Sequence, residues 1–145
     1  MRILIDADGC PVVDLALRLA RQYGKACLIL CDAAHVFEKE GATTLTFMRG
    51  ADSVDFALAN LAEPNDIVIT QDYGLAAMCL ARRAIPLSQN GMRYTDENIG
   101  ALLSSRHAAR KIRNAGGRLK GPPKRTRAED GAFEAALHAL LSQAE

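Results

Sequence analysis

The chain has 145 residues, with 18 Lys or Arg against 17 Asp or Glu, and is therefore long enough for one domain with its own hydrophobic core. No segment approaches the roughly 20 consecutive apolar residues of a membrane span, and the N-terminus has no cleavable signal pattern. The four cysteines lack zinc-ligand spacing. We therefore expect a single domain over residues 1–145, reduced thiols, no membrane partner and a cytoplasmic location.

Short runs of β-branched residues alternate with helical segments in the first half of the chain. The apolar run 2–6 is too short for a helix and predicts a buried strand. Pro11 opens a helix that continues to residue 23, where Gly24 ends it. The next predicted elements are a strand at 26–31, a short helix at 33–40, a strand at 43–47 and a helix from Asp52 or Ser53 to residue 61.

The same alternation continues through residue 88. A turn at 64–66, which includes Asp66, leads to a buried strand at 67–71, a helix at 75–83 and a last strand at 85–88. Strands that alternate with helices are typical of a parallel sheet covered on both faces. We therefore expect a three-layer α/β fold of about five strands in the order 3-2-1-4-5.

The last third of the chain is predicted to be helical. Thr95 is expected to cap a helix that runs to Ala115. Residues 118–129 are polar, rich in Pro and Gly, and predict a long loop. Asp130 is expected to cap a final helix, whose apolar stripe should dock against the body.

The charged residues are unevenly distributed. Residues 1–98 contain 9 Lys or Arg and 13 Asp or Glu, whereas residues 99–145 contain 9 and 4. Residues 99–128 contain no carboxylate. The sequence thus predicts an α/β body over 1–98 and a basic helical extension over 99–145, and the basic charge favours an anionic partner.

Aspartates follow the ends of two predicted strands. Asp6 and Asp8 end the first strand two residues apart, so their side chains share a face if the strand geometry continues to Asp8. Asp72 ends the fourth strand, which neighbours the first in the expected order, and ligands of open α/β sheets bind at this switch point. Asp52 and Asp55 open the helix after the third strand. Up to five carboxylates are expected to converge.

Carboxylates that lie close together repel one another unless a cation neutralises them. Oxygen ligands suit Mg²⁺ or Mn²⁺, which can activate water for displacement at a phosphodiester. The candidate catalytic residues, which are also the candidate metal ligands, are Asp6, Asp8, Asp55 and Asp72. Thr70, or the backbone at Gly9 and Cys10, is a candidate for positioning phosphate.

Each of these carboxylates also has a structural alternative. Asp52 and Asp55 have the spacing in which one residue caps a helix and the other interacts with its dipole. The structural alternative for Asp6, Asp8 and Asp72 is a loop or cap carboxylate. Their positions at strand ends near one crevice favour the functional interpretation.

The basic extension supplies charge complementary to a polyanion. Arg106, Arg110 and Arg113 share one face of the predicted helix. A solvated basic surface is the alternative interpretation of this run. The candidate nucleic-acid-binding residues are Arg106, Arg110, Arg113, Arg118, Lys120, Lys124, Arg125 and Arg127. The expected partner is nucleic acid, with RNA preferred over DNA.

Five ordered blocks resemble the bacterial YaiI/YqxD family of uncharacterised proteins. The resemblance covers almost the whole chain and is therefore more specific than any single block. The blocks are Asp6-Ala7-Asp8-Gly9-Cys10-Pro11, Gly50-Ala51-Asp52-Ser53-Val54-Asp55, Asp66-Ile67-Val68-Ile69-Thr70-Gln71-Asp72 followed by Leu75-Ala76-Ala77, Gly91 with Tyr94-Thr95, and Gly121-Pro122.

This resemblance implies a PIN-like fold, a nuclease-type scaffold whose relatives cut RNA with a divalent metal held by acidic residues. It implies metal ligation by Asp6, further acidic positions at Asp55 and Asp72, and a direct or neighbouring role for Asp8. Nuclease activity follows from such a fold by analogy alone.

Two other functions compete with a nuclease. The run from Ile3 to Gly9 is similar to the D-x-D-G opening of haloacid dehalogenase-like phosphatases, in which Asp6 would be the nucleophile and Asp8 the acid/base. Cys10 weakens this similarity, because Thr or Ser is usual there. A nucleic-acid-binding module without catalytic activity is the other alternative.

Overall fold

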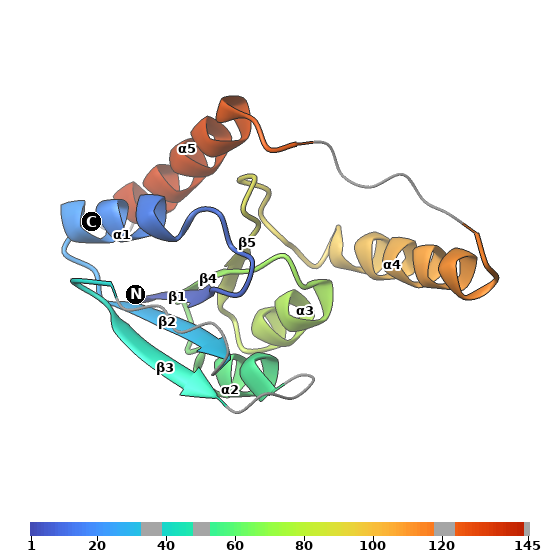
Figure 1. The fold of residues 1–145 in the computed structure, drawn as a ribbon. Coiled ribbons are helices and arrows are strands. Elements are labelled where there is room, and N and C mark those ends of the chain that lie inside the picture. The colour runs from blue at the N-terminus through green and yellow to red at the C-terminus, as the bar shows by residue number, and fades with distance from the viewer. Residues whose placement is uncertain (33–38, 48–52, 118–123, 144–145) are drawn as a thin grey trace.

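The structure is a computed structural model that describes residues 1–32, 39–47, 53–117 and 124–143. Its centre is a five-stranded parallel sheet in the order β3-β2-β1-β4-β5, which confirms the predicted fold class and strand order. Helices lie on both sides of the sheet (Figure 1). The elements are β1 (Ile3–Asp6), α1 (Val13–Gln22), β2 (Cys27–Asp32), β3 (Thr43–Phe47), α2 (Ser53–Leu61), β4 (Ile67–Ile69), α3 (Tyr73–Ala81), β5 (Ile85–Leu87), α4 (Ile99–Asn114) and α5 (Arg127–Gln143).

The strands build one apolar layer on each face of the sheet, because successive side chains point to opposite sides. Ile3 and Ile5 face the layer formed with α1 and α5, whereas Leu4 faces the layer formed with α2 and α3. The predicted docking of the last helix is confirmed, since Phe133 and Leu137 of α5 are fully buried. Helix α5 lies beside α1 (Figure 1).

Helix α4 differs from the other helices in having no buried residue. It packs against α3 at one edge of the body and extends away from the sheet (Figure 1). Its amphipathic character is therefore not used for the core, and its side chains are available for another surface.

The predicted strands and helices are present in the described chain, but four helices begin at different residues, α1 at Val13 rather than Pro11. Helix α3 begins at Tyr73 rather than residue 75, because the side chain of Asp72 caps it. Helix α4 begins at Ile99 with Asn98 as its N-cap residue, and Thr95 exchanges side-chain-to-backbone hydrogen bonds with Asn98 in the turn just before the helix.

The prediction that Asp130 caps the final helix is wrong. Helix α5 begins at Arg127, where Thr126 and Glu129 form a capping box. The backbone N–H of Thr126 donates to Oε1 of Glu129 at 2.9 Å, and the N–H of Glu129 donates to Oγ1 of Thr126 at 3.3 Å. Asp130 instead accepts a hydrogen bond from Arg125.

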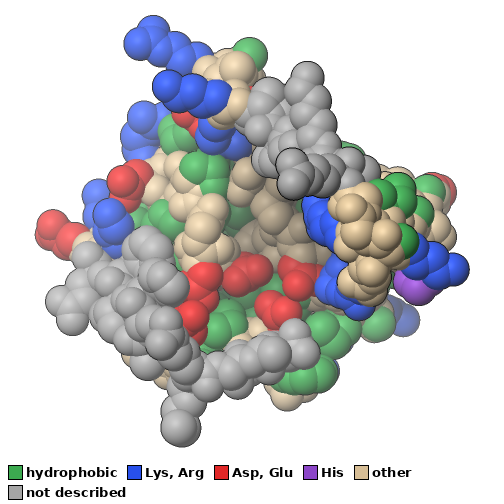
Figure 2. All heavy atoms as spheres, turned by 45° about the vertical axis from the view of Figure 1, so that its right-hand side comes forward, with side chains coloured by type: hydrophobic (Ala, Val, Ile, Leu, Met, Phe, Trp, Pro, Cys, Tyr) green, Lys and Arg blue, Asp and Glu red, His purple; other side chains and the backbone are tan. Residues whose placement is uncertain are grey.

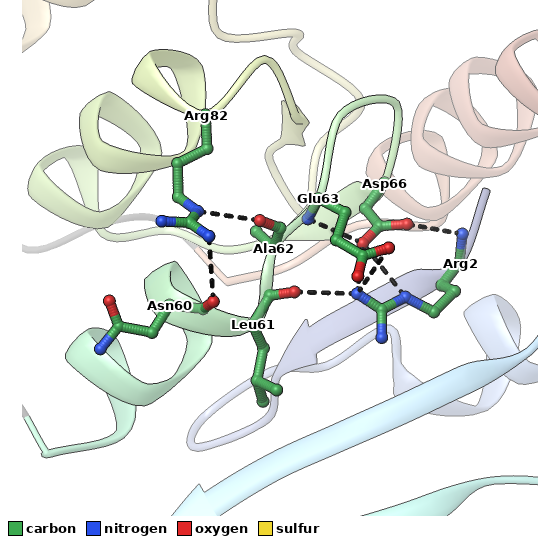
Figure 3. A network of polar contacts seen from close by, with 7 residues as sticks. All are labelled: Arg2, Asn60, Leu61, Ala62, Glu63, Asp66 and Arg82. Atoms are coloured by element: carbon green, nitrogen blue, oxygen red, sulfur yellow. Dashed lines mark hydrogen bonds and ion pairs between the residues drawn. The ribbon is translucent and has the colours of Figure 1, made fainter.

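A partly buried ion pair joins Arg2, just before β1, to Asp66 in the turn before β4 at the amino-terminal edge of the sheet (Figure 3). Asp66 is 2% exposed, and its carboxylate accepts the N–H of Arg2 at 2.9 Å, Nη2 of Arg2 at 2.7 Å and the N–H of Glu63 at 3.0 Å. Burial alone would raise the pKa of Asp66, but these hydrogen bonds lower it below its usual value. Asp66 is thus more than the turn residue that the sequence predicts.

Two further expectations concern the cysteines and membrane-spanning helices. All four cysteines are free, as predicted. No helix in the described ranges combines the length and apolar character needed to cross a bilayer. The predicted helix at 33–40, and the predicted site residues Asp52, Arg118 and Lys120, fall wholly or mostly outside the described residues.

Candidate functional site

Asp6 and Thr70 lie side by side at the carboxyl edge of the sheet. Strands β1 and β4 are neighbours with Ile5 opposite Ile69, so the next residue along each chain is brought to the same place. The hydroxyl of Thr70 donates to Oδ2 of Asp6 at 2.8 Å and accepts the N–H of Asp72 at 3.0 Å. Thr70 therefore links the two aspartates that follow the adjacent strands.

Asp6 lines a small pocket of about 60 Å³. Its Oδ1 accepts no hydrogen bond from the described residues. Every buried side-chain oxygen of these residues has a hydrogen-bond partner, so Oδ1 is not buried and is accessible from the pocket. Burial raises the pKa of Asp6 to about 6, against the lowering effect of the Thr70 hydrogen bond and with contributions from the charges of Asp72 and Asp8. Asp6 is thus a carboxylate held in a site that disfavours its charge. The lining residues of the pocket are Asp6, Asp8, Gly9, Cys10, Ile69, Thr70, Gln71 and Gln89.

The raised pKa predicts that Asp6 costs the protein stability at neutral pH. Between pH 4 and 6 the folded state binds more protons at Asp6 than the unfolded state does, so this contribution to stability falls as the pH rises. We expect Asp6→Asn to stabilise the metal-free protein by up to about 3 kcal/mol at pH 7.5, with the gain vanishing below pH 4. Urea unfolding in EDTA at both pH values measures the difference. An Asn variant that is less stable than the parent at pH 7.5 would contradict this assignment.

Asp8 and Cys10 complete the wall of this pocket. Oδ2 of Asp8 accepts the N–H of Asp32 on β2 at 3.1 Å. Burial raises the pKa of the Cys10 thiol, so it stays protonated at neutral pH, and its N–H donates to the carbonyl of Ala7 at 3.0 Å. The Thr70 hydroxyl is likewise engaged with Asp6 and Asp72. The donors of both residues predicted to position phosphate are thus engaged within the chain, and that role stays a prediction.

A second pocket, of about 310 Å³, lies against Asp72. Asp55 of α2, Asp72 at the N-cap of α3 and Arg106 of α4 line it. Oδ1 of Asp72 accepts the N–H of Leu75 at 3.0 Å and lies 3.5 Å from Nη1 of Arg106. A Cβ at Gly74 would come within 3.2 Å of this oxygen and 3.3 Å of the guanidinium, so the glycine leaves room for the ion pair.

The donor set suits a hard divalent cation only in part. Among the described residues, no three His, Cys, Asp or Glu side chains are placed to hold one ion together. Mg²⁺, however, usually keeps several waters and uses one or two carboxylates. Oδ1 of Asp6 and Oδ2 of Asp72 have no partner within the described chain. These two oxygens are therefore available to a hydrated ion, although Asp6 and Asp72 line different pockets, and ligation by Asp6, Asp8, Asp55 and Asp72 stays a prediction.

Basic side chains lie next to these carboxylates. Figure 2 shows the acidic groups gathered in the middle of one face, with Lys and Arg side chains on their right, where α4 lies. Arg106, Arg110 and Arg113 of α4 are exposed, as are Lys124 and Arg127. An acidic crevice bordered by basic side chains can hold a phosphate chain and a cation together.

The guanidinium of Arg125, one of the predicted nucleic-acid-binding residues, is engaged inside the chain by three hydrogen bonds. Nε donates to Oδ1 of Asp130, Nη1 to Oδ1 of Asn90 and Nη2 to the carbonyl of Gln89, each at 2.7 Å. Gln89 lines the pocket of Asp6. Arg125 therefore ties the start of α5 to the rim of the candidate site.

Sequence analysis did not identify Phe56, which lines the second pocket and is 59% exposed. Its spacing from the apolar residues of α2 is the feature of the sequence that could have identified it. Val54 and Leu58 are four residues apart and face the core, so Phe56 falls on the opposite side of the helix. Phe56 therefore lies on the surface of α2, at the second pocket, rather than in the core.

The fold and the site together define a three-layer α/β protein with an acidic crevice at the carboxyl edge of a parallel sheet. Residues 4–143 match the family model described as "Uncharacterized BCR, YaiI/YqxD family". The chain belongs to this family, as the sequence resemblance indicated.

Curated relatives agree with this assignment. The chain is similar to a "UPF0178 protein" of Exiguobacterium sibiricum, with 55% identity over 143 residues that cover 99% of this chain and 98% of the relative. It is 46% identical to a UPF0178 protein of Ruminiclostridium cellulolyticum, over 94% of this chain and 90% of that one. A UPF0178 protein of Natranaerobius thermophilus is 41% identical, over 99% and 97%. No solved structure matches the chain significantly.

Proposed function

We propose that this protein is a divalent-metal-dependent nuclease that hydrolyses phosphodiester bonds in RNA, with DNA as the second choice of substrate. The observation that carries the proposal is the linkage of Asp6 and Asp72 through Thr70, beside the arginines of α4. Carboxylate oxygens are the ligands that Mg²⁺ and Mn²⁺ prefer, and the neighbouring cations suit a phosphate backbone.

Each group in the site has a separate task in this function. Asp6 and Asp72 offer oxygens for the ion, with Asp8 and Asp55 as the further candidates. When bound, a divalent ion lowers the pKa of a water molecule and offsets the negative charge that develops on the phosphate. Thr70 orients Asp6 through its hydroxyl, and Arg106, Arg110 and Arg113 hold the strand against the acidic crevice.

A cleavage assay tests this function. The full chain is incubated with a labelled single-stranded RNA, the matching DNA strand and p-nitrophenyl phosphate, each with Mn²⁺, with Mg²⁺ and with EDTA. We expect RNA products with either ion and none with EDTA. Release of nitrophenol without strand cleavage would favour the phosphatase, and binding without any product would favour the non-catalytic module.

Thr70→Val is expected to shift the pH dependence of cleavage. The hydrogen bond from Thr70 lowers the pKa of Asp6, so its loss raises that pKa above about 6 and makes protons compete more strongly with the ion. The acidic limb of the rate profile should move to higher pH. Thr70→Ser keeps the hydroxyl and should leave the limb in place; equal profiles for both variants would contradict the role of this hydrogen bond.

The arginines of α4 are expected to contribute by binding phosphate groups. Changing Arg110 and Arg113 together to Gln should weaken RNA binding in all sequences alike and reduce the slope of log affinity against log salt by roughly one for each arginine replaced. Fluorescence anisotropy over a salt series measures this slope. Arg18→Gln on α1, whose partner is Glu134, is the matched control and should leave the slope unchanged. An unchanged slope in the α4 variant would exclude this helix from the interface.

A further inference from the structure

Phe56 is the most exposed of the large hydrophobic side chains in the described part of the chain. It is 59% exposed, against 45% for Ile112, 39% for Met92 and 37% for Met1. Leaving an aromatic ring in water forgoes the stabilisation that its burial would provide. The position of Phe56 at the mouth of a pocket, beside a charged crevice, calls for a ligand with a flat apolar face.

The pocket beside Phe56 has walls of two kinds. Met78 of α3 adds a partly exposed apolar side chain beside Phe56, the fully buried Leu75 lies beneath them, and Arg106 contributes a guanidinium. Figure 2 shows hydrophobic side chains below the acidic group on this face. The volume of about 310 Å³ is at the lower end of the range of roughly 300–1,000 Å³ for small-molecule pockets.

These features match the chemistry of a nucleobase. A base stacks on an aromatic face, and an adjacent arginine can stack on the base or pair with its phosphate. Asp72 lines this pocket and its charge reaches Asp6 in the neighbouring one, so a base seated here would place its phosphates next to the acidic crevice. A base inside a duplex has both faces covered and cannot enter without unstacking.

We propose that this pocket binds an unpaired nucleobase stacked on Phe56, and that the protein therefore selects single-stranded nucleic acid. This inference rests on the proposed function, because it assigns the substrate class of the same site. It differs from that function in what it requires, since stacking on Phe56 needs neither a metal ion nor cleavage.

The chain contains no tryptophan, so Phe56→Trp introduces a single fluorescent probe at the pocket. In EDTA, where the proposed cleavage is absent, a 12-nucleotide RNA strand should quench this emission, and the matching blunt duplex should leave it unchanged. Met92→Trp, at an exposed position outside the pocket, is the matched control and should not respond. Anisotropy of a labelled strand reports binding independently of the tryptophan.

Phe56→Ala should weaken binding of the single strand by about 5- to 100-fold, the effect of removing one stacked base, and change duplex binding less than about twofold. Tight strand binding without quenching, or equal affinity of the Ala variant, would overturn the base pocket. Quenching in a protein that never cleaves RNA would retain the pocket and refute the nuclease, whereas cleavage without quenching would do the reverse. A protein that binds neither strand would refute both.

Discussion

Replacing Asp6 with asparagine should remove metal-dependent RNA cleavage, with a loss of more than about 100-fold in rate at saturating RNA. Asp6 is the carboxylate whose Oδ1 opens to the pocket at the end of β1, and whose Oδ2 is fixed by Thr70 at 2.8 Å. The amide of Asn keeps the shape and the hydrogen bond, but it lacks the negative charge that a divalent ion requires. Product formation in Mn²⁺, measured by gel or by a fluorescent quencher strand, gives the rate.

The control for this variant is Asp96→Asn, which removes one negative charge from an exposed turn outside both pockets of the site. Its cleavage rate should stay within about twofold of the parent, since a distant exposed charge is largely screened at physiological salt. Cleavage that continues in Asp6→Asn would place the reaction elsewhere. Asp6→Asn should still bind RNA, because the arginines of α4 are unchanged.

The ion pair at the opposite edge of the sheet should have the largest effect on stability. Asp66→Ala is expected to lower the free energy of unfolding by about 3 kcal/mol, because it removes the shortest ion pair of Arg2 and leaves the backbone N–H groups of Arg2 and Glu63 without their acceptor, while Nη2 of Arg2 keeps the carbonyl of Leu61. Urea unfolding at pH 7 measures this loss. The pKa of Asp66 is lowered in the folded state, so the contribution is present at neutral pH and is lost as the pH falls below about 4.

Glu63→Gln serves as the matched control for this network. Its carboxylate lies 3.7 Å from Arg2 and its side chain is 70% exposed, so this pair should contribute less than about 0.5 kcal/mol. If Asp66→Ala and Glu63→Gln have similar small effects, the network of Figure 3 does not hold β1 to β4.

The sheet and its strand order could be predicted because the chain alternates buried β-branched runs with helical segments. The consecutive apolar residues in a run such as 67–71 indicate a buried strand. Right-handed connections between parallel strands then leave few possible orders for five strands. Helix ends were harder to predict, since several residues near each end can act as a cap. Thr126 rather than Asp130 caps α5 because a partner three residues later, Glu129, completes the capping box.

The placement of Asp6 and Asp72 on either side of Thr70 was also predictable in part, because adjacent parallel strands end at the same edge. Other parts of the site depend on packing between distant segments, which residue spacing does not reveal. Arg125 lies in the basic run that predicts phosphate binding, but its guanidinium is held by Gln89, Asn90 and Asp130. Phe56 can be recognised as a surface residue only once the face of α2 that packs in the core is known.

The two pockets divide the work that the proposal assigns to the site. The small pocket of Asp6 is suited to an ion and water, and the larger pocket of Phe56 and Arg106 is suited to a base. Asp72 connects them, since it lines the larger pocket while its N–H binds the Thr70 hydroxyl beside Asp6. A strand with one base in the larger pocket would place the adjacent phosphate near the ion in the smaller pocket.

Anomalous diffraction from a crystal soaked in Mn²⁺ tests the central claim most directly, because it locates the ion independently of any substrate. The proposal predicts a peak about 2.1 Å from Oδ1 of Asp6, with a second oxygen from Asp72 or Asp8 and waters completing the shell. The peak should disappear in crystals of Asp6→Asn. A strong Mn²⁺ peak elsewhere, with none at the carboxyl ends of β1 and β4, would contradict the account.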